Sequence, residues 1–119
     1  MDLPSSIQSA AQALREQRTT CEALARASLD RIKALQPSSN AFLTITADAA
    51  LARAAELDRE LAAGRVRGPL HGIPVAIKDC FDTAGVRTTQ GSRYFEKNVP
   101  NADAAAVARL AQAGAVMVG

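Results

Sequence analysis

The pattern of the chain changes at residues 68–78, GPLHGIPVAIK. Two glycines and two prolines fall within its first seven residues, and a stretch of this kind interrupts any helix. The run that follows, Val75 to Ile77, is short, apolar and β-branched at both ends, which is the pattern of a strand buried on both faces. The sequence therefore predicts a turn-rich segment that leads directly into a buried strand.

A second buried strand is predicted further along, at residues 115–118, AVMV. Before it we expect a helix from about Asp103 to Ala113, with Asp103 as its N-cap and Gly114 at its end. Two buried strands joined by a helical crossover form a βαβ unit with parallel strands. Residues 79–102 of this crossover lack regular periodicity, and irregular segments of such length are often functional.

The chain before residue 67 has the periodicity of helices. Apolar residues spaced three and four apart from Ile7 to Leu14 predict a short first helix, which Ser5 or Ser6 would cap. A T-x-x-E capping box formed by Thr19 and Glu22 predicts the start of a second helix, and Pro37 predicts its end.

A third helix is expected to have Thr46 as its N-cap and to stop at Gly64, with a solvated face that holds Arg53 and other charged residues. Before it, residues 41–46, AFLTIT, predict a short strand or an extended connector. We therefore expect a single α/β domain in which residues 1–66 are mostly helical and residues 67–119 form the βαβ segment.

Composition excludes several classes of function. The chain has 119 residues and a net charge of +2, with 14 basic and 12 acidic residues scattered along it, so no basic surface for nucleic acid is expected. No run approaches the roughly 18 to 20 apolar residues that span a bilayer, and the first residues do not form a signal peptide. Cys21 and Cys80 lie in unlike contexts and predict free thiols, and the single histidine, His71, makes a metal site improbable. We expect a soluble, cytoplasmic protein without a metal.

Lys78 is the first candidate for chemistry. Ligands bind at the carboxyl ends of parallel strands, and Lys78 follows the predicted strand directly. Burial at that position would favour the uncharged amine, which can act as a base. The alternative is that Lys78 and Asp79 are only a charged pair at a strand end, solvated or joined in a salt bridge.

A resemblance to a known family favours the first interpretation. Residues 68–92, GPLHGIPVAIKDCFDTAGVRTTQGS, closely resemble the segment of amidase signature enzymes that bears their catalytic lysine. The resemblance continues through DAAAVARLAQAGAVMVG at 103–119 and more loosely through NAFLTIT at 40–46. It implies an α/β fold with a mixed, largely parallel sheet between layers of helices, of which this chain would be the incomplete amino-terminal part.

The resemblance also implies a mechanism without a cofactor. Family members use a serine nucleophile, a second serine in a cis peptide, and a lysine that relays protons through that second serine. Lys78 takes the place of this lysine. The glycine- and serine-rich stretch that carries the two serines lies downstream of the lysine segment in the family and is absent here, so the chain alone is expected to be inactive.

Other polar residues receive smaller roles. None of the serines present lies in a glycine-rich serine motif. The loop that carries TTQGS lies beside the active site in relatives, so its small residues either line the substrate pocket or form a plain turn. His71 is expected to make a structural hydrogen bond, and Cys80 to be a small buried side chain that is not a nucleophile. The candidates for the pocket are Thr88, Thr89, Gly91 and Ser92.

Three functions follow from this sequence. The first is an amidase that hydrolyses linear carboxamides, with a small-molecule amide as its partner and no direct contact with nucleic acid or membrane. The second is the glutaminase subunit of a tRNA-dependent amidotransferase, placed second because Cys80 stands where those subunits more often have asparagine. The third is a truncated, non-enzymatic chain that acts through helix packing. A homodimer, or association with the remainder of the domain, is left open.

Overall fold

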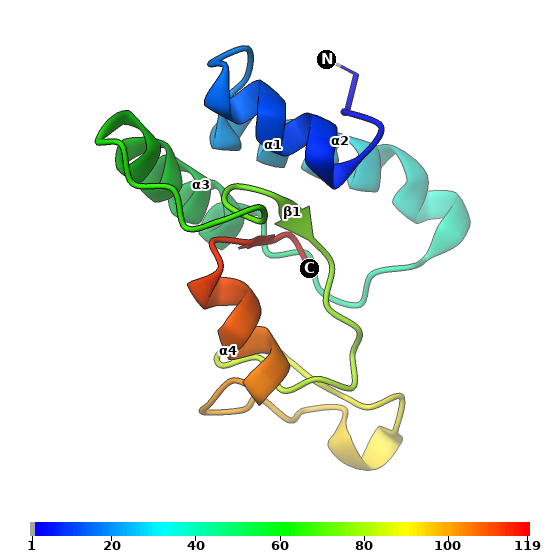
Figure 1. Cartoon of the computed structure of the whole chain (residues 1–119). Helices are drawn as coiled ribbons and strands as arrows, with labels where there is room; N and C mark the ends of the chain where they lie inside the picture. Colours follow the sequence, from blue (N-terminus) through cyan, green and yellow to red (C-terminus); the bar gives the residue numbers. More distant parts are fainter. Residues whose placement is uncertain (1) are drawn as a thin grey trace.

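The computed structural model describes residues 2–119 as four helices and a short parallel sheet (Figure 1). The predicted α/β class is confirmed, because helices precede a parallel strand pair that α4 connects. No helix among the described residues is long and apolar enough to cross a membrane. Along the chain the elements are α1 (Ile7–Arg15), α2 (Cys21–Ser39), α3 (Ala47–Ala62), β1 (Pro74–Val75), the 3₁₀ helix η1 (Arg93–Phe95), α4 (Ala105–Gln112) and β2 (Val116–Met117).

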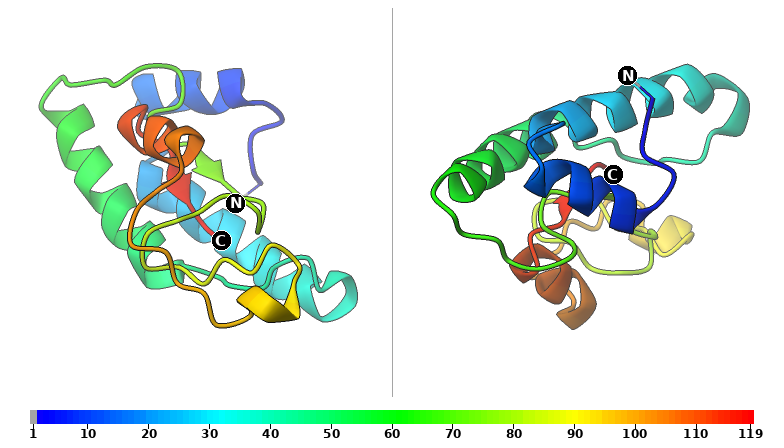
Figure 2. Two further views of the ribbon diagram at one scale, coloured as in Figure 1. Left: turned by 90° about the horizontal axis from the view of Figure 1, so that it is seen from below. Right: turned by 45° about the horizontal axis from the view of Figure 1, so that its top comes forward.

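The sheet has the parallel pairing that the βαβ pattern predicts. Pro74 lies opposite Val116 in the register. The pairing continues past the strand ends, because the Ile77 N–H donates to the Gly119 carbonyl at 2.8 Å. Helices α2 and α3 pack on the strands from one side, and α4 lies on the other side (Figures 1 and 2).

The hydrophobic core lies where α1, α2 and α3 meet the sheet. Small side chains contribute much of it, which lets the helices and the strands approach closely. The strands provide Ile73, Val116 and Val118, and the other members come from the helices or their first residues: Ala10, Leu14, Cys21, Leu24, Ala25, Ala50, Ala54 and Leu57.

The start of α2 differs from the predicted capping box. Thr20 is the N-cap, and its hydroxyl accepts a hydrogen bond from the Ala23 N–H at 3.0 Å. Glu22 does not reach back to a cap and instead contacts Arg26 at 2.7 Å. Because Thr19 and Thr20 are adjacent and equally suited to capping, the sequence alone does not select between them.

Asp58 on α3 caps the same helix from outside. Its Oδ1 accepts from the Cys21 N–H at 2.7 Å, and its Oδ2 accepts from the Glu22 N–H at 3.1 Å. The carboxylate therefore satisfies two free amides and lies at the positive end of the helix dipole. This contact fixes α3 against the beginning of α2.

Replacing Asp58 by alanine is expected to lower the free energy of unfolding by about 2 kcal/mol, since two helix amides lose their acceptor. Asp58→Asn keeps one acceptor oxygen and should cost about half as much. Asp30→Ala, at an exposed position on α2, is the control and should change the stability by less than about 0.5 kcal/mol. Denaturant unfolding of the whole protein measures all three; equal values for Asp58→Ala and Asp30→Ala would contradict the cap.

Pro37 does not end α2, contrary to the prediction. The helix runs to Ser39 and is closed by Asn40, which has a left-handed conformation with φ of 46°. A proline removes only its own N–H, and the Asn40 N–H still donates to the Gln36 carbonyl at 2.8 Å. Pro37 therefore lies within the last turn of the helix.

Residues 41–46 form the extended connector, not a strand. The Thr46 N–H donates to the Val118 carbonyl at 3.1 Å, so the connector reaches β2 at its end. Thr46 is the N-cap residue of α3 but does not cap it through its side chain, because its hydroxyl donates to the Met117 carbonyl at 2.9 Å. The connector and the sheet are thus joined at the beginning of α3.

The predicted cap of α4 is also wrong. Ala104 is the N-cap residue, and the Asp103 carboxylate accepts from the Ala84 N–H at 2.7 Å instead. Asp103 therefore ties the long loop to the start of α4. The expected helix ends at Gly64 and Gly114 are confirmed, since both glycines follow their helices with positive φ.

The first strand is not buried on both faces as predicted. Val75 is half-buried and Ala76 is exposed. The physical reason is that α2 and α3 cover only one side of this segment, and in the described part of the chain its other side borders an open cleft.

Candidate functional site

A cleft of about 1010 Å³ lies beside the carboxyl ends of the two strands. Its walls are the connector 41–46, the beginning of α3, residues 76–91 and the ends of α4 and β2. Its lining is mainly apolar and includes Phe42, Ile77 and Met117. This position agrees with the general placement of ligand sites at the carboxyl ends of parallel strands.

Lys78 lies on the wall of this cleft, three residues after the end of β1. Its side chain is exposed, and its amine has no hydrogen-bond or ion-pair partner within residues 2–119. The burial expected for this lysine is therefore not supplied by the described residues, because the cleft beside it is open to solvent. The amine is free to meet a ligand or another segment of protein.

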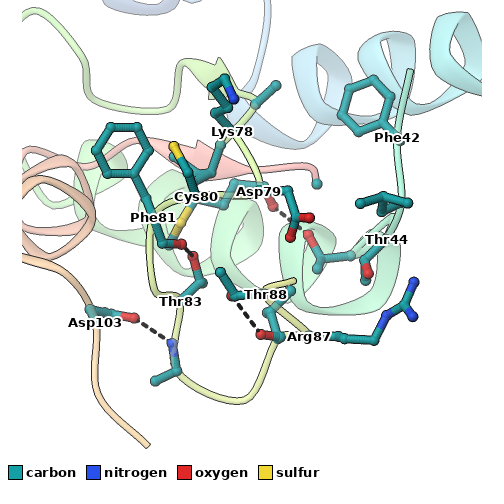
Figure 3. Close-up of a pocket in the computed structure, with 18 of the residues that line it drawn as sticks. Phe42, Thr44, Lys78, Asp79, Cys80, Phe81, Thr83, Arg87, Thr88 and Asp103 are labelled. Carbon is teal, nitrogen blue, oxygen red and sulfur yellow. Dashed lines mark hydrogen bonds between the residues drawn. The ribbon is translucent and has the colours of Figure 1, made fainter. Parts of the chain in front are cut away.

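Lys78 and Asp79 do not form an ion pair in the part of the chain that the structure covers. Their side chains extend in different directions from the backbone, with Lys78 toward β1 and Asp79 toward the loop (Figure 3). Asp79 instead accepts from Thr89 twice, from its N–H at 2.7 Å and from its hydroxyl. The salt-bridge form of the alternative interpretation is thus wrong, while Lys78 itself is solvated.

The environment of Asp79 favours its ionised form. Partial burial acts to raise the pKa of this carboxyl, but the hydrogen bonds from the Thr89 hydroxyl and from the Thr89 and Gly91 amides outweigh it and hold the pKa below its usual value. A lowered pKa means that the stabilisation is present above the pKa of the unfolded chain and is lost as the pH falls through the folded value. Asp79 therefore remains a carboxylate at neutral pH.

The four predicted pocket residues divide into two groups. Thr88 and Gly91 line the cleft. Thr89 is buried, with its hydroxyl directed to Asp79. Ser92 accepts from the Tyr94 N–H at 3.2 Å and caps η1, so it faces away from the cleft lining.

His71 has the structural role that its sequence context predicts. The ring is buried, its Nδ1 accepts from the Arg67 N–H at 3.2 Å, and its Nε2 lies 3.0 Å from the Leu57 carbonyl. Because a backbone N–H only donates and a carbonyl only accepts, the ring is the neutral tautomer with its proton on Nε2. His71 therefore joins α3 to the turn before β1 and takes no part in the cleft.

Arg53 is a cleft residue that the sequence reasoning missed. The charge pattern of the third helix predicts a solvated position, but the side chain is only 26% exposed and donates to the Ala111 carbonyl of α4 at 3.0 Å. It also contacts Glu56 at 2.7 Å. Its spacing from the buried Ala50 and Leu57 is the signal that could have found it, since residues three and four apart share a helix face.

The two cysteines have opposite environments. Cys80 lines the cleft and is exposed, so the expectation of a buried side chain is wrong: the segment after Lys78 borders open space. Cys21 is buried in the core. Burial, with a contribution from Asp58, raises the pKa of the Cys21 thiol to about 12.

A thiol reagent at pH 8 is therefore expected to modify Cys80 rapidly and Cys21 hardly at all, since only about one Cys21 thiol in 10⁴ would be ionised. Mass spectrometry of the labelled peptides measures both sites, and unfolding in denaturant should expose the second one. The control Cys80→Ser should leave the native chain unlabelled; rapid labelling of Cys21 would contradict its burial.

Within residues 2–119 no group of three or more histidine, cysteine or acidic side chains is arranged to hold a metal ion. The cleft offers one amine, hydroxyls, an exposed thiol and apolar walls. These groups suit binding of a small, partly apolar molecule and proton transfer at Lys78.

Comparison with known proteins extends this description. The family model Amidase matches residues 23–119. The A chain of the glutamyl-tRNA(Gln) amidotransferase of Geobacter sp. (strain M21) is 51% identical over 94 residues, which cover 79% of this chain and 19% of that protein. Its counterpart in Acaryochloris marina is 43% identical over 114 residues, covering 96% of this chain and 24% of that protein.

Solved structures give the same result. The peptide amidase of Stenotrophomonas maltophilia superposes with a TM-score of 0.89 at 37% identity, over 97% of this chain and 24% of that one. The chain thus spans about a fifth to a quarter of the length of the relatives it matches.

Proposed function

This chain belongs to the amidase signature family, and from that membership we propose that Lys78 is the catalytic lysine of an enzyme that breaks carboxamide C–N bonds. The observation that carries the proposal is the position of Lys78: it lies in the segment GPLHGIPVAIKD, directly after a parallel strand, on the wall of the apolar cleft. A lysine without other bonds in this place is available for proton transfer.

The proposed chemistry requires an uncharged amine. The lysine takes a proton from a bridging serine, that serine takes one from the nucleophile, and the acyl-enzyme is then resolved by water or by another amine. Because Lys78 is exposed within the described residues, the proposal includes its coverage by further parts of the whole protein. Desolvation there would favour the neutral form.

Residues 1–119 alone are expected to be inactive, because no serine is among the residues that line the described cleft. Incubation of the isolated chain with carboxamide substrates should release no ammonia above the rate in buffer. Activity of this chain by itself would show that another group, such as Cys80, acts as a nucleophile.

A second candidate is the glutaminase component of a glutamyl-tRNA(Gln) amidotransferase, favoured by the identities of 43–51% to proteins named as part of that enzyme. The peptide amidase is less similar, at 37%, but its structure shows the same fold over nearly the whole chain. In the first case the substrate is a small linear amide, and in the second the ammonia passes to a partner reaction.

Assays on the whole protein separate the two candidates. Ammonia release from small carboxamides by the protein alone would support the hydrolase. Release from glutamine that depends on partner proteins and glutamyl-tRNA(Gln) would support the amidotransferase component. No turnover in either assay would overturn the enzymatic proposal in favour of the non-enzymatic chain. A cytoplasmic location, and the homodimer, stay predictions.

A further inference from the structure

Asp79 is joined to the loop of the cleft wall by both its side chain and its backbone. Its carboxylate accepts from the Thr89 N–H and from the Thr89 hydroxyl, and its carbonyl accepts from the Gln90 N–H at 2.8 Å. The Thr89 hydroxyl in turn accepts from the Gly91 N–H at 3.2 Å. Three consecutive residues of the loop are thus held to the residue after Lys78.

These bonds are the direct polar links that the described residues show between positions 89–91 and the end of β1. The neighbouring contacts of the loop stay within the loop: the Thr88 N–H donates to the Asn98 carbonyl at 2.9 Å, and the Asn98 side chain donates to the Thr88 carbonyl at 3.0 Å. Removing the Asp79 contacts would therefore leave the loop intact but detach it from the strand.

The residues on either side of this attachment are those that line the cleft. Thr88 and Gly91 lie on its wall next to the buried Thr89, and Lys78 lies on its wall next to Asp79. A rigid link between Asp79 and Thr89 consequently fixes the distance between the cleft wall and the lysine amine. Misplacement by about 1 Å in such a site can cost about 10²-fold in rate.

We propose that Asp79 is a positioning residue, whose carboxylate and carbonyl hold Thr89, Gln90 and Gly91 so that the pocket wall keeps a fixed geometry relative to Lys78. For its effect on turnover the proposal rests on the amidase function above, whereas the attachment of the loop is independent of it. A carboxylate suits this role because it offers two acceptors, one for the amide and one for the hydroxyl of Thr89.

The first test measures the attachment by amide hydrogen exchange in the whole protein. Thr89→Val removes the hydroxyl while keeping the shape of the side chain, and should speed exchange at the amides of residues 90 and 91 about tenfold or more. Exchange at Ile77 and Val118 in the parallel pairing should not change. Thr89→Ser keeps a hydroxyl and should restore protection.

Thr83→Val is the control for the exchange measurement, since its hydroxyl bonds only to the Phe81 carbonyl in the same turn, at 3.3 Å. It should leave exchange at residues 90 and 91 unchanged. Unaltered protection in Thr89→Val would overturn the attachment, and so would equal losses at Ile77 and Val118, which would indicate general destabilisation.

The second test measures turnover. Asp79→Asn and Thr89→Val should each lower kcat/KM about tenfold or more, the double variant should be no worse than the more affected single variant, and Thr89→Ser should recover most of the loss. Additive losses in the double variant, or no loss, would overturn the positioning role. If the parent protein cleaves no amide, the proposed function fails, and the exchange data still decide whether Asp79 holds the loop.

Discussion

Lys78→Ala is expected to lower amide turnover by the whole protein by about 10³-fold or more, because the group that accepts the proton from the bridging serine is lost. The same change should leave the free energy of unfolding within about 0.5 kcal/mol, since the side chain is exposed and has no bonded partner in the described residues. Steady-state kinetics and denaturant unfolding measure the two effects separately. A loss of activity without a loss of stability is the expected result.

Two further variants test the assigned role of the amine. Lys78→Arg keeps the positive charge but cannot act as a base near neutral pH, so it should be as inactive as the alanine variant. Lys97→Ala removes an exposed lysine that does not line the cleft, and should retain activity. Substantial activity in Lys78→Arg would show that only charge is needed and would remove the proposed proton transfer.

Gly72→Ala is expected to be the most destabilising small substitution, with a loss of about 3 kcal/mol. Gly72 has φ of +77°, a conformation that costs other residues energy. A Cβ there would also overlap the Cys21 Sγ and lie 3.2 Å from the Leu14 Cδ1 in the core. Both partners are buried, so neither can move away without disturbing the packing. Thermal or denaturant unfolding of the whole protein measures the loss.

Gly64 provides the matched control. It has the same φ of +77°, but a Cβ would meet no atom within 4 Å, so Gly64→Ala should cost only the backbone term of about 1 kcal/mol. Adding Cys21→Ala to Gly72→Ala should recover part of the lost stability, because the sulfur that blocks the Cβ is gone. Equal effects of Gly64→Ala and Gly72→Ala would disprove the role of packing.

The sequence predicts the elements better than their ends. The positions of the helices, the parallel βαβ unit and the turn-rich segment before β1 follow from local periodicity and from glycine and proline. The caps of α2 and α4 do not, because Thr19 and Thr20 are locally equivalent and Asp103 has a partner in Ala84, nineteen positions earlier. The cap supplied by Asp58 also depends on tertiary contact.

The candidate site is predictable in its central residue and less so around it. Lys78 stands out because its position after a strand and its sequence context agree. The direction of Thr89 toward Asp79, and the exposure of Cys80, depend on the path of an irregular loop, which has no periodic signal. The burial expected for Lys78 assumes strands covered on both faces, and the described residues cover one.

The pairing of β1 with β2 has a consequence for the order in which this chain folds. Helices α2 and α3 are neighbours in sequence and pack together, so their association closes only a short loop and can occur early. The strand pair is joined only after the long irregular segment and α4 have been made, which places it late, both in refolding and during synthesis on the ribosome. A nascent chain stalled before Ala115 would therefore hold a helical intermediate in which the segment carrying Lys78 has no strand partner.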